Sequence, residues 1–158
     1  MNKKTLNNIT YFFICLIFMI VFDFMLTNYI LSDICSISDN FKLIDIVYVQ
    51  NTGAAFSTFQ HATAMLIGVS IFAMIMLLYI MIKGFERYSM MFNFYMAILI
   101  AGIFCNTYER IVFGYVRDFI NLKFMEFPVF NISDILINVG VFALMILIIT
   151  KKYLKNDK

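Results

Sequence analysis

Residues 127–150 read FPVFNISDILINVGVFALMILIIT, an apolar run that opens on polar residues and follows the only proline of the chain. A proline is well placed just before a helix, because its missing N–H costs little there and its fixed φ orients the entering chain. The part from about residue 131 to 150 has the length that a helix needs to cross a bilayer, about 20 residues. Its acidic residue, Asp134, stands at the opening of this predicted span.

The composition of the whole chain is that of a membrane protein. Hydrophobic residues make up 63% of the 158 positions and charged residues 14%, against roughly 45–50% and about 25% in an average soluble domain. We expect one domain, residues 1–158, with membrane spans at about residues 9–31, 62–82, 89–105 and 131–150. The loops between the first and second spans and between the third and fourth are then at about residues 32–61 and 106–130.

The basic residues predict how the spans are oriented. The N-terminus, the turn at residues 83–88 and the C-terminal tail hold eight of the twelve Lys and Arg residues. The positive-inside rule then places both termini in the cytoplasm and both longer loops outside. A basic start before an apolar run is also seen in secretory signal peptides, but this run is about twice as long as a signal core and no cleavage pattern of small residues follows it.

The first outer loop has a strand-like pattern. Apolar residues recur with a period near two between residues 41 and 49, which is typical of short strands, here lying on the membrane surface. Gly53 follows in Asn51-Thr52-Gly53 and permits a turn or a close backbone approach. The predicted fold class is therefore an all-α membrane protein with four transmembrane helices, a small extracytoplasmic β-rich cradle and a short extracytoplasmic helix or loop.

Two aspartates stand where predicted spans meet the outer loops. Asp118 lies in Val116-Arg117-Asp118-Phe119, after the third span, and Asp134 opens the fourth. A carboxylate near hydrocarbon is costly, so an acidic residue at such a position indicates function by default. The alternative for Asp134 is a helix N-cap that faces water. The predicted topology brings both carboxylates to the outer leaflet, where they can act together.

Other residue types indicate no metal, cofactor or nucleic-acid partner. The three cysteines match no zinc or disulfide spacing, and His61 is the only histidine, which argues against a zinc site or a histidine-based triad. The net charge of +2 is too small to indicate a nucleic-acid partner. Asp23 lies inside the first apolar run, and we expect it to be a structural polar residue, because charges buried in membranes are usually paired.

Four short motifs, in order and in register, resemble those of the lipoprotein signal peptidases, the type II signal peptidases of bacteria. The motif Asn-x-Gly-x-Ala-Phe is matched by Asn51, Gly53, Ala55 and Phe56. The motif Gly-Asn-x-x-Asp-Arg is matched in part, by Asn106 and Arg110. Val-x-Asp-Phe and Phe-Pro-x-Phe-Asn-x-Ala-Asp are matched by Val116, Asp118, Phe119, Phe127, Pro128, Phe130, Asn131 and Asp134.

The resemblance implies an intramembrane aspartic endopeptidase with Asp118 and Asp134 as its catalytic pair. It implies a diacylglyceryl-modified prolipoprotein as substrate, cut before the lipidated cysteine, in the lipid of the bacterial cytoplasmic membrane. Two neighbouring carboxyl groups share a proton, so the charged one can activate water while the neutral one protonates the oxyanion or the leaving amine. The residues implied to support the site or bind substrate are Asn51, Gly53, Ala55, Phe56, Asn106, Arg110 and Asn131.

The chain departs from the family pattern at supporting positions. Cys105 stands in place of glycine, Glu109 in place of aspartate, Ser133 in place of alanine and Thr27 in place of lysine. We expect Glu109 to be a structural polar residue. It keeps the charge of aspartate but adds a methylene, which would shift any ion pair with Arg110. Arg110 has two open roles: it fixes the outer loop through Glu109 or Asp118, or it contacts substrate.

Two other functions compete with a peptidase. A small transporter or channel subunit would place acidic residues near the bilayer midplane in several spans, whereas here only Asp23 is deep. A catalytically weak or silent relative that acts as a binding factor is compatible with the four departures. The intact pair Asp118 and Asp134 argues against this second alternative.

Overall fold

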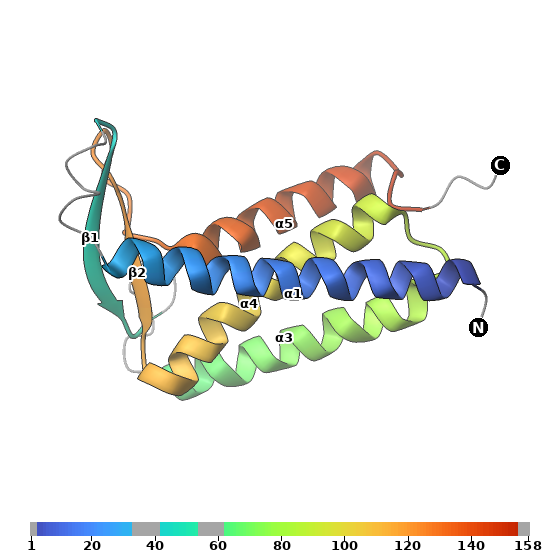
Figure 1. The fold of residues 1–158 in the computed structure, drawn as a ribbon, viewed down its shortest axis with the longest axis horizontal. Helices are drawn as coiled ribbons and strands as arrows, with labels where there is room; N and C mark the ends of the chain where they lie inside the picture. The colour runs from blue at the N-terminus through green and yellow to red at the C-terminus, as the bar shows by residue number, and fades with distance from the viewer. Residues whose placement is uncertain (1–2, 33–41, 54–61, 155–158) are drawn as a thin grey trace.

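The computed structural model describes residues 3–32, 42–53 and 62–154. Among these residues, four long helices lie side by side and a small sheet stands across one end of the bundle (Figure 1). The helices are α1 (Lys3–Ser32), α3 (Thr63–Gly84), α4 (Met90–Phe113) and α5 (Ile132–Ile149), and each is long and apolar enough to cross a membrane. The predicted fold class, mainly helical with four helices able to span a membrane, is confirmed.

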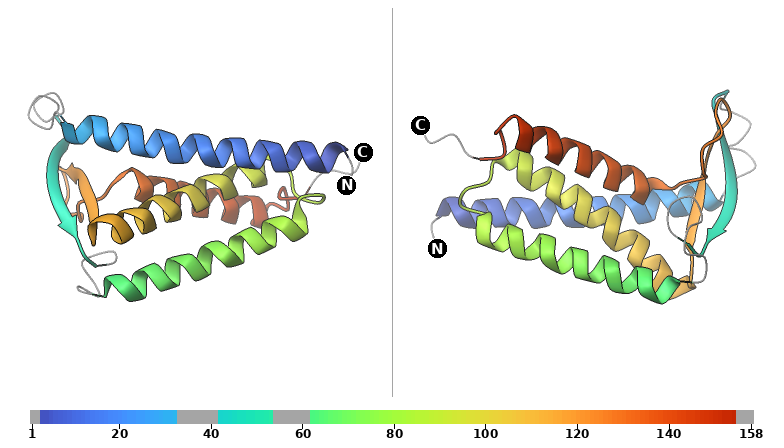
Figure 2. Two further views of the ribbon diagram at one scale, coloured as in Figure 1. Left: turned by 60° about the horizontal axis from the view of Figure 1, so that its bottom comes forward. Right: turned by 180° about the vertical axis from the view of Figure 1, so that it is seen from behind.

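Helix α4 is the centre of the bundle. It packs against each of the other three helices, and 61% of its most apolar segment is buried inside the protein, against 6% in α3 and 11% in α1. Figure 2 shows α1 and α3 spread apart on either side of it. The central core of the bundle joins all four helices through residues that include Phe12, Met81, Met96, Leu99 and Leu144.

Two glycines allow α4 and α5 to approach closely. A Cβ atom on Gly102 would lie 2.6 Å from the main-chain oxygen of Ser133, and one on Gly140 would lie 2.8 Å from the Cβ atom of Leu99. Both approaches are closer than real Cβ contacts, so a side chain at either position would push the helices apart. This close packing holds the beginning of α5 against the C-terminal half of α4.

The sheet consists of β1 (Ile44–Asn51) and β2 (Val116–Leu122), which pair antiparallel with Ile44 opposite Leu122 and Asn51 opposite Val116. Strand β1 confirms the strand-like pattern of the first outer loop. Strand β2 comes from a segment that the sequence assigns only to a loop. Its residues 118–120 are all buried, so the apolar and polar alternation of a half-exposed strand is missing there.

Helix α4 ends at Phe113, not at about residue 105 as predicted. The prediction stopped where polar residues interrupt the apolar run. In the structure Asn106, Glu109 and Arg110 lie on the last turns of the helix instead. Glu109 and Arg110 follow Asn106 by three and four positions, which places each of them near Asn106. Gly114 ends the helix with a left-handed backbone, φ +83°, and donates its N–H to the oxygen of Arg110.

The helices alternate in direction, so the beginning of α1 and the end of α5 lie at the same end of the bundle, opposite the sheet (Figure 1). The sheet, the last turns of α4 and the first turn of α5 therefore meet at the other end. This is the region to which the sequence assigns the functional residues.

Candidate active site

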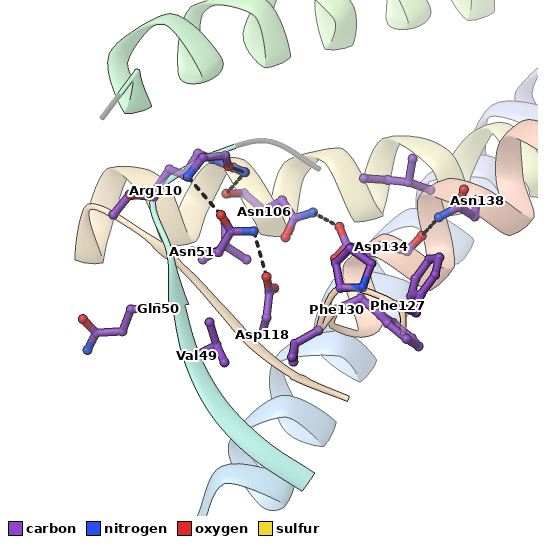
Figure 3. Close-up of a pocket in the computed structure, with 16 residues that line it drawn as sticks. Val49, Gln50, Asn51, Asn106, Arg110, Asp118, Phe127, Phe130, Asp134 and Asn138 are labelled. Carbon is purple, nitrogen blue, oxygen red and sulfur yellow. Dashed lines mark hydrogen bonds between the residues drawn. The ribbon is translucent and has the colours of Figure 1, made fainter. Parts of the chain in front are cut away.

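A cavity of about 530 Å³ lies where the sheet meets α4 and α5. Asp118 from β2 and Asp134 from α5 both line it, together with Asn51, Asn106 and Arg110 (Figure 3). Residues 127–130, which include the proline, form another part of its wall. The structure thus brings the two predicted aspartates to one cavity.

Asp118 is almost completely buried, with 2% of its surface exposed. Its two carboxylate oxygens accept from two amides: Oδ2 from Asn51 Nδ2 and Oδ1 from Asn131 Nδ2, both at 2.8 Å. The N–H of Gly53 donates to Asn51 Oδ1 at 2.9 Å, so the turn at Gly53 aims the Asn51 amide at the carboxylate. The donors on Asp118 are neutral.

Asp134 is held by the capping box of α5. Asn131 is the N-cap and its Oδ1 accepts from the N–H of Asp134 at 2.9 Å, while Asp134 Oδ2 accepts from the N–H of Asn131 at 3.2 Å. The other carboxylate oxygen accepts from Asn106 Nδ2 at 2.8 Å. Asp134 therefore contributes to the cap, as the N3 partner and not as the N-cap residue, and it also faces the cavity.

Asn131 joins the two aspartates into one network. Its Nδ2 donates to Asp118 Oδ1 and also to Asn106 Oδ1, the latter at 3.1 Å, and Asn106 in turn donates to Asp134. Asn131 is buried, and so is Asn106. A buried chain of amides of this kind fixes the relative positions of the carboxylates that it connects.

The pKa of Asp118 is raised to about 6. Burial is the largest cause and the neighbouring charge of Asp134 adds to it, while the amides of Asn51 and Asn131 and the charge of Arg110 lower the pKa and offset part of the rise. A carboxyl group of this kind exchanges its proton near neutral pH. The arrangement can therefore do acid–base chemistry, which a carboxylate with an ordinary pKa does poorly at neutral pH.

Arg110 connects β1 to α4. Its Nη2 donates to the main-chain oxygen of Gly53 at 3.0 Å, and its Nη1 donates to the main-chain oxygen of Asn106 at 3.2 Å. The guanidinium thus fixes the Asn51-Thr52-Gly53 turn beside the cavity. Among the described residues, Arg110 lies in no ion pair with Asp118 or Asp134.

Glu109 forms an ion pair with Arg117 and, within the described residues, none with Arg110. Glu109 Oε1 accepts from the Nη2 and Nε of Arg117 at 2.6 Å and 2.8 Å, and its Oε2 accepts from the main-chain N–H of Arg117 at 2.7 Å. Neighbouring residues on a helix point in different directions, so Glu109 and Arg110 do not face each other. The pair attaches α4 to β2 at the residue before Asp118.

Asp23 contacts the first turn of α5. It is 3% exposed on α1, and its Oδ1 accepts from Ser133 Oγ at 2.9 Å. Thr27 is buried one turn further along α1, and Cys105 is completely buried on α4. Three of the four departures from the family pattern are thus buried residues of α1, α4 and α5 that do not line the cavity, and one of them, Ser133, donates a hydrogen bond to Asp23.

The cavity also contains residues that the sequence did not single out, among them Gln50, Thr52 and Asn138. Asn138 follows Asp134 by four positions, so helical spacing from a known site residue could have found it. Ala55, Phe56 and His61 lie outside the described residues. Within the described ranges, no group of three or more His, Cys, Asp and Glu side chains could hold a metal ion.

Residues 15–150 match the model of the family described as signal peptidase (SPase) II. The chain belongs to the signal peptidase II family. It is 37% identical to the lipoprotein signal peptidase of Microcystis aeruginosa over 117 residues, which cover 70% of this chain and 73% of that relative. It is 31% identical to the lipoprotein signal peptidase of Staphylococcus aureus over 148 residues, 90% of each chain.

The fold agrees with this family assignment. A bacterial membrane enzyme whose structure was determined by the in meso method at 2.3 Å resolution superimposes with a TM-score of 0.76 at 27% identity, over 93% of this chain and 91% of that one. A second structure of a bacterial membrane enzyme, at 1.9 Å, gives a TM-score of 0.72 at the same identity. Membership of the family makes this chain a multi-pass membrane peptidase, as its motifs predict.

Proposed function

We propose that this protein removes the signal peptides of bacterial lipoprotein precursors and that Asp118 and Asp134 are its catalytic pair. The observation that carries the proposal is the joint setting of the two carboxylates. Both line one cavity, and both are linked through the amides of Asn106 and Asn131. In this proposal the bond that is cut precedes a cysteine that carries a diacylglyceryl group.

The reaction follows from sharing one proton between the two groups. The ionised carboxylate takes a proton from a water molecule, whose oxygen attacks the scissile carbonyl carbon and forms the new C–O bond. The protonated carboxyl donates to the oxygen that becomes negative. The C–N bond then breaks, and a carboxyl group protonates the leaving amine. The pKa of Asp118, about 6, suits a group that holds and releases a proton at neutral pH.

The surrounding polar residues support this pair. Asn51, Asn106 and Asn131 donate to the carboxylates and keep them in place. Arg110 holds the Gly53 turn at the edge of the cavity, where an incoming peptide backbone would pass. The roles of Ala55 and Phe56, which the family pattern includes, stay predictions.

The proposal places the site at the outer leaflet of the bacterial cytoplasmic membrane, with both termini in the cytoplasm. The basic residues support this orientation, because those of the described chain at the end away from the sheet include Lys83, Arg87, Lys151 and Lys152. A precursor whose signal helix and lipid both lie in the bilayer would reach a cavity at the bilayer surface from the side.

Neither alternative function gains support. Family membership gives no reason to expect a transporter. A silent binding factor would not need two carboxylates in one cavity with a shared amide network. The departures at Thr27, Cys105 and Ser133 are buried and do not line that cavity.

The test uses purified protein in lipid, with a precursor whose cysteine carries the diacylglyceryl group. We expect the wild type to cut it just before that cysteine, and both Asp118→Asn and Asp134→Asn to lose at least about 100-fold in rate, the usual scale of acid–base catalysis. A precursor without the lipid is the control for substrate class. The proposal is wrong if the wild type leaves the lipidated precursor intact or if either variant cuts at the wild-type rate.

A further inference from the structure

Asn138 is a polar side chain in the cavity that the aspartate network does not include. It is exposed, and it lines the cavity beside Ile137. Because it follows Asp134 by four positions on α5, it lies on the same helix face, about 6 Å further along the axis and away from the sheet. Figure 3 shows Gln50 and Asn138 at opposite ends of the site, with the two aspartates between them.

The hydrogen bond of Asn138 fixes the direction of its amide. Its Nδ2 donates to the main-chain oxygen of Asp134 at 2.9 Å. The nitrogen must therefore face the helix backbone, and Figure 3 shows the oxygen turned away from this bond. In the described part of the chain, no donor lies within hydrogen-bond distance of Asn138 Oδ1. The side chain thus presents a free acceptor at the cavity.

The depth of this acceptor restricts what can bind it. Asn138 lies in a helix apolar enough to span the membrane, where an unpaired polar group is costly. The esters of lipid and of a diacylglyceryl group accept hydrogen bonds and have no donor to offer. A peptide backbone does have donors. A peptide that presents its scissile carbonyl to the aspartates cannot be helical there, so its neighbouring N–H groups need acceptors.

We propose that Asn138 is a substrate-binding residue whose Oδ1 accepts a backbone N–H of the signal peptide about two residues before the scissile bond. An extended chain rises about 3.3 Å per residue, so the 6 Å between Asp134 and Asn138 correspond to about two residues. The signal peptide lies in the bilayer, so the residues before the cut extend in the direction in which α5 runs. This inference rests on the proposed function.

The test removes the donor from the substrate and the acceptor from the enzyme. In a series of lipidated precursors, each of the last four peptide N–H groups before the cut is replaced in turn by an ester oxygen. We expect the wild type to cut one member of the series about tenfold more slowly than the all-amide precursor. Asn138→Leu should cut the all-amide precursor about tenfold more slowly and show no further loss with that same ester.

Control variants separate contact from structure. Asn138→Thr keeps a side-chain acceptor, so it should recover part of the rate and of the sensitivity to that ester. Val139→Ala, at the adjacent and exposed position outside the cavity lining, should leave the rate and the ester profile unchanged. A merely structural role for Asn138 would slow all members of the series equally.

Two results would overturn the inference while leaving the proposed function intact. One is a wild type that shows no sensitive position, as expected if water satisfies Asn138. The other is an Asn138→Leu variant with the wild-type ester profile. A wild type that fails to cut the all-amide precursor would overturn the proposed function, and this inference with it.

Discussion

Two kinds of buried carboxylate lie beside the last turns of α4, and they differ in their donors. Glu109 accepts from a guanidinium and a main-chain N–H of Arg117, all at 2.8 Å or less. Asp118 accepts from the neutral amides of Asn51 and Asn131. The guanidinium makes Glu109 one half of an ion pair that links two elements, whereas the neutral amides hold Asp118 in place and leave it free to bind a proton.

This comparison separates a structural acid from a reactive one without reference to any motif. The Glu109–Arg117 pair attaches strand β2 to α4, and it does so at the residue next to Asp118. The cation nearest the cavity, Arg110, donates to main-chain oxygens of Gly53 and Asn106. The site therefore has a positive charge nearby and, within the described residues, no ion pair on either aspartate.

The largest effect should come from breaking the amide network. Asn131→Ala removes the donor to Asp118 and Asn106, and it also removes the N-cap of α5. We expect cleavage to fall about 100-fold, as for reacting groups misplaced by about 1 Å, and stability to fall by about 1 kcal/mol. Initial rates per folded protein measure the first effect.

Asn131→Ser is the control for this prediction, because serine keeps a good N-cap and cannot supply the amide donors. Its stability should be near that of the wild type while its rate stays low. Loss of a residue that positions the reacting groups should slow cleavage by more than about twofold. If Asn131→Ala cuts within about twofold of the wild type, the amide network does not hold Asp118 and Asp134 in place.

Breaking the ion pair should affect stability more than chemistry. Glu109→Gln leaves the partly buried Arg117 without its charged partner, which we expect to cost about 3 kcal/mol in the free energy of unfolding. The matched control is Lys123→Gln at the exposed pair of Lys123 with Asp45, 3.7 Å apart, where a loss of about 0–1 kcal/mol is expected. Thermal or denaturant unfolding in detergent measures the stability of both variants. Equal losses would show that the Glu109–Arg117 pair is no more important for stability than the exposed pair.

A smaller effect should follow from separating α4 and α5. Gly102→Ala places a methyl group 2.6 Å from the main-chain oxygen of Ser133, so the first turn of α5 must shift. We expect about tenfold slower cleavage, because Asp134 moves with that turn. Gly68→Ala on α3 meets nothing within 4 Å. This control should keep its activity. An equal loss in both variants would show that the close packing of α4 on α5 does not position Asp134.

Much of the fold could be predicted from the sequence because membrane spans are visible in composition. Each apolar run became a helix, and the alternation between residues 41 and 49 marked β1. Strand β2 and the last turns of α4 could not be found in this way. Their polar residues are typical of a loop. That they form a strand and a helix depends on contacts with distant parts of the chain, such as the pairing of β2 with β1.

The site was predicted in its residues more than in its contacts. Asp118 and Asp134 stood out at the mouths of spans. The ion pair of Glu109 with Arg117 could not be found in the sequence, because it depends on which face of α4 meets β2. The contact of Asp23 with Ser133 joins residues 110 positions apart, a pairing that no local pattern shows. Asn138 was missed because it is a single amide in an apolar run, and the sequence alone does not distinguish it from a polar residue without a function.

The central claim is that the two aspartates act as one proton-sharing pair, and the pKa of Asp118 tests it most directly. The measurement is a pH titration of the carboxyl carbons of ¹³C-labelled aspartate by NMR, in the wild type and in Asp134→Asn. We predict a pKa of about 6 in the wild type. In the variant it should be lower, because the charge that raises it is gone, yet still above 3.8 because Asp118 stays buried. A wild-type pKa near 3.8, or the same value in both proteins, would contradict the account.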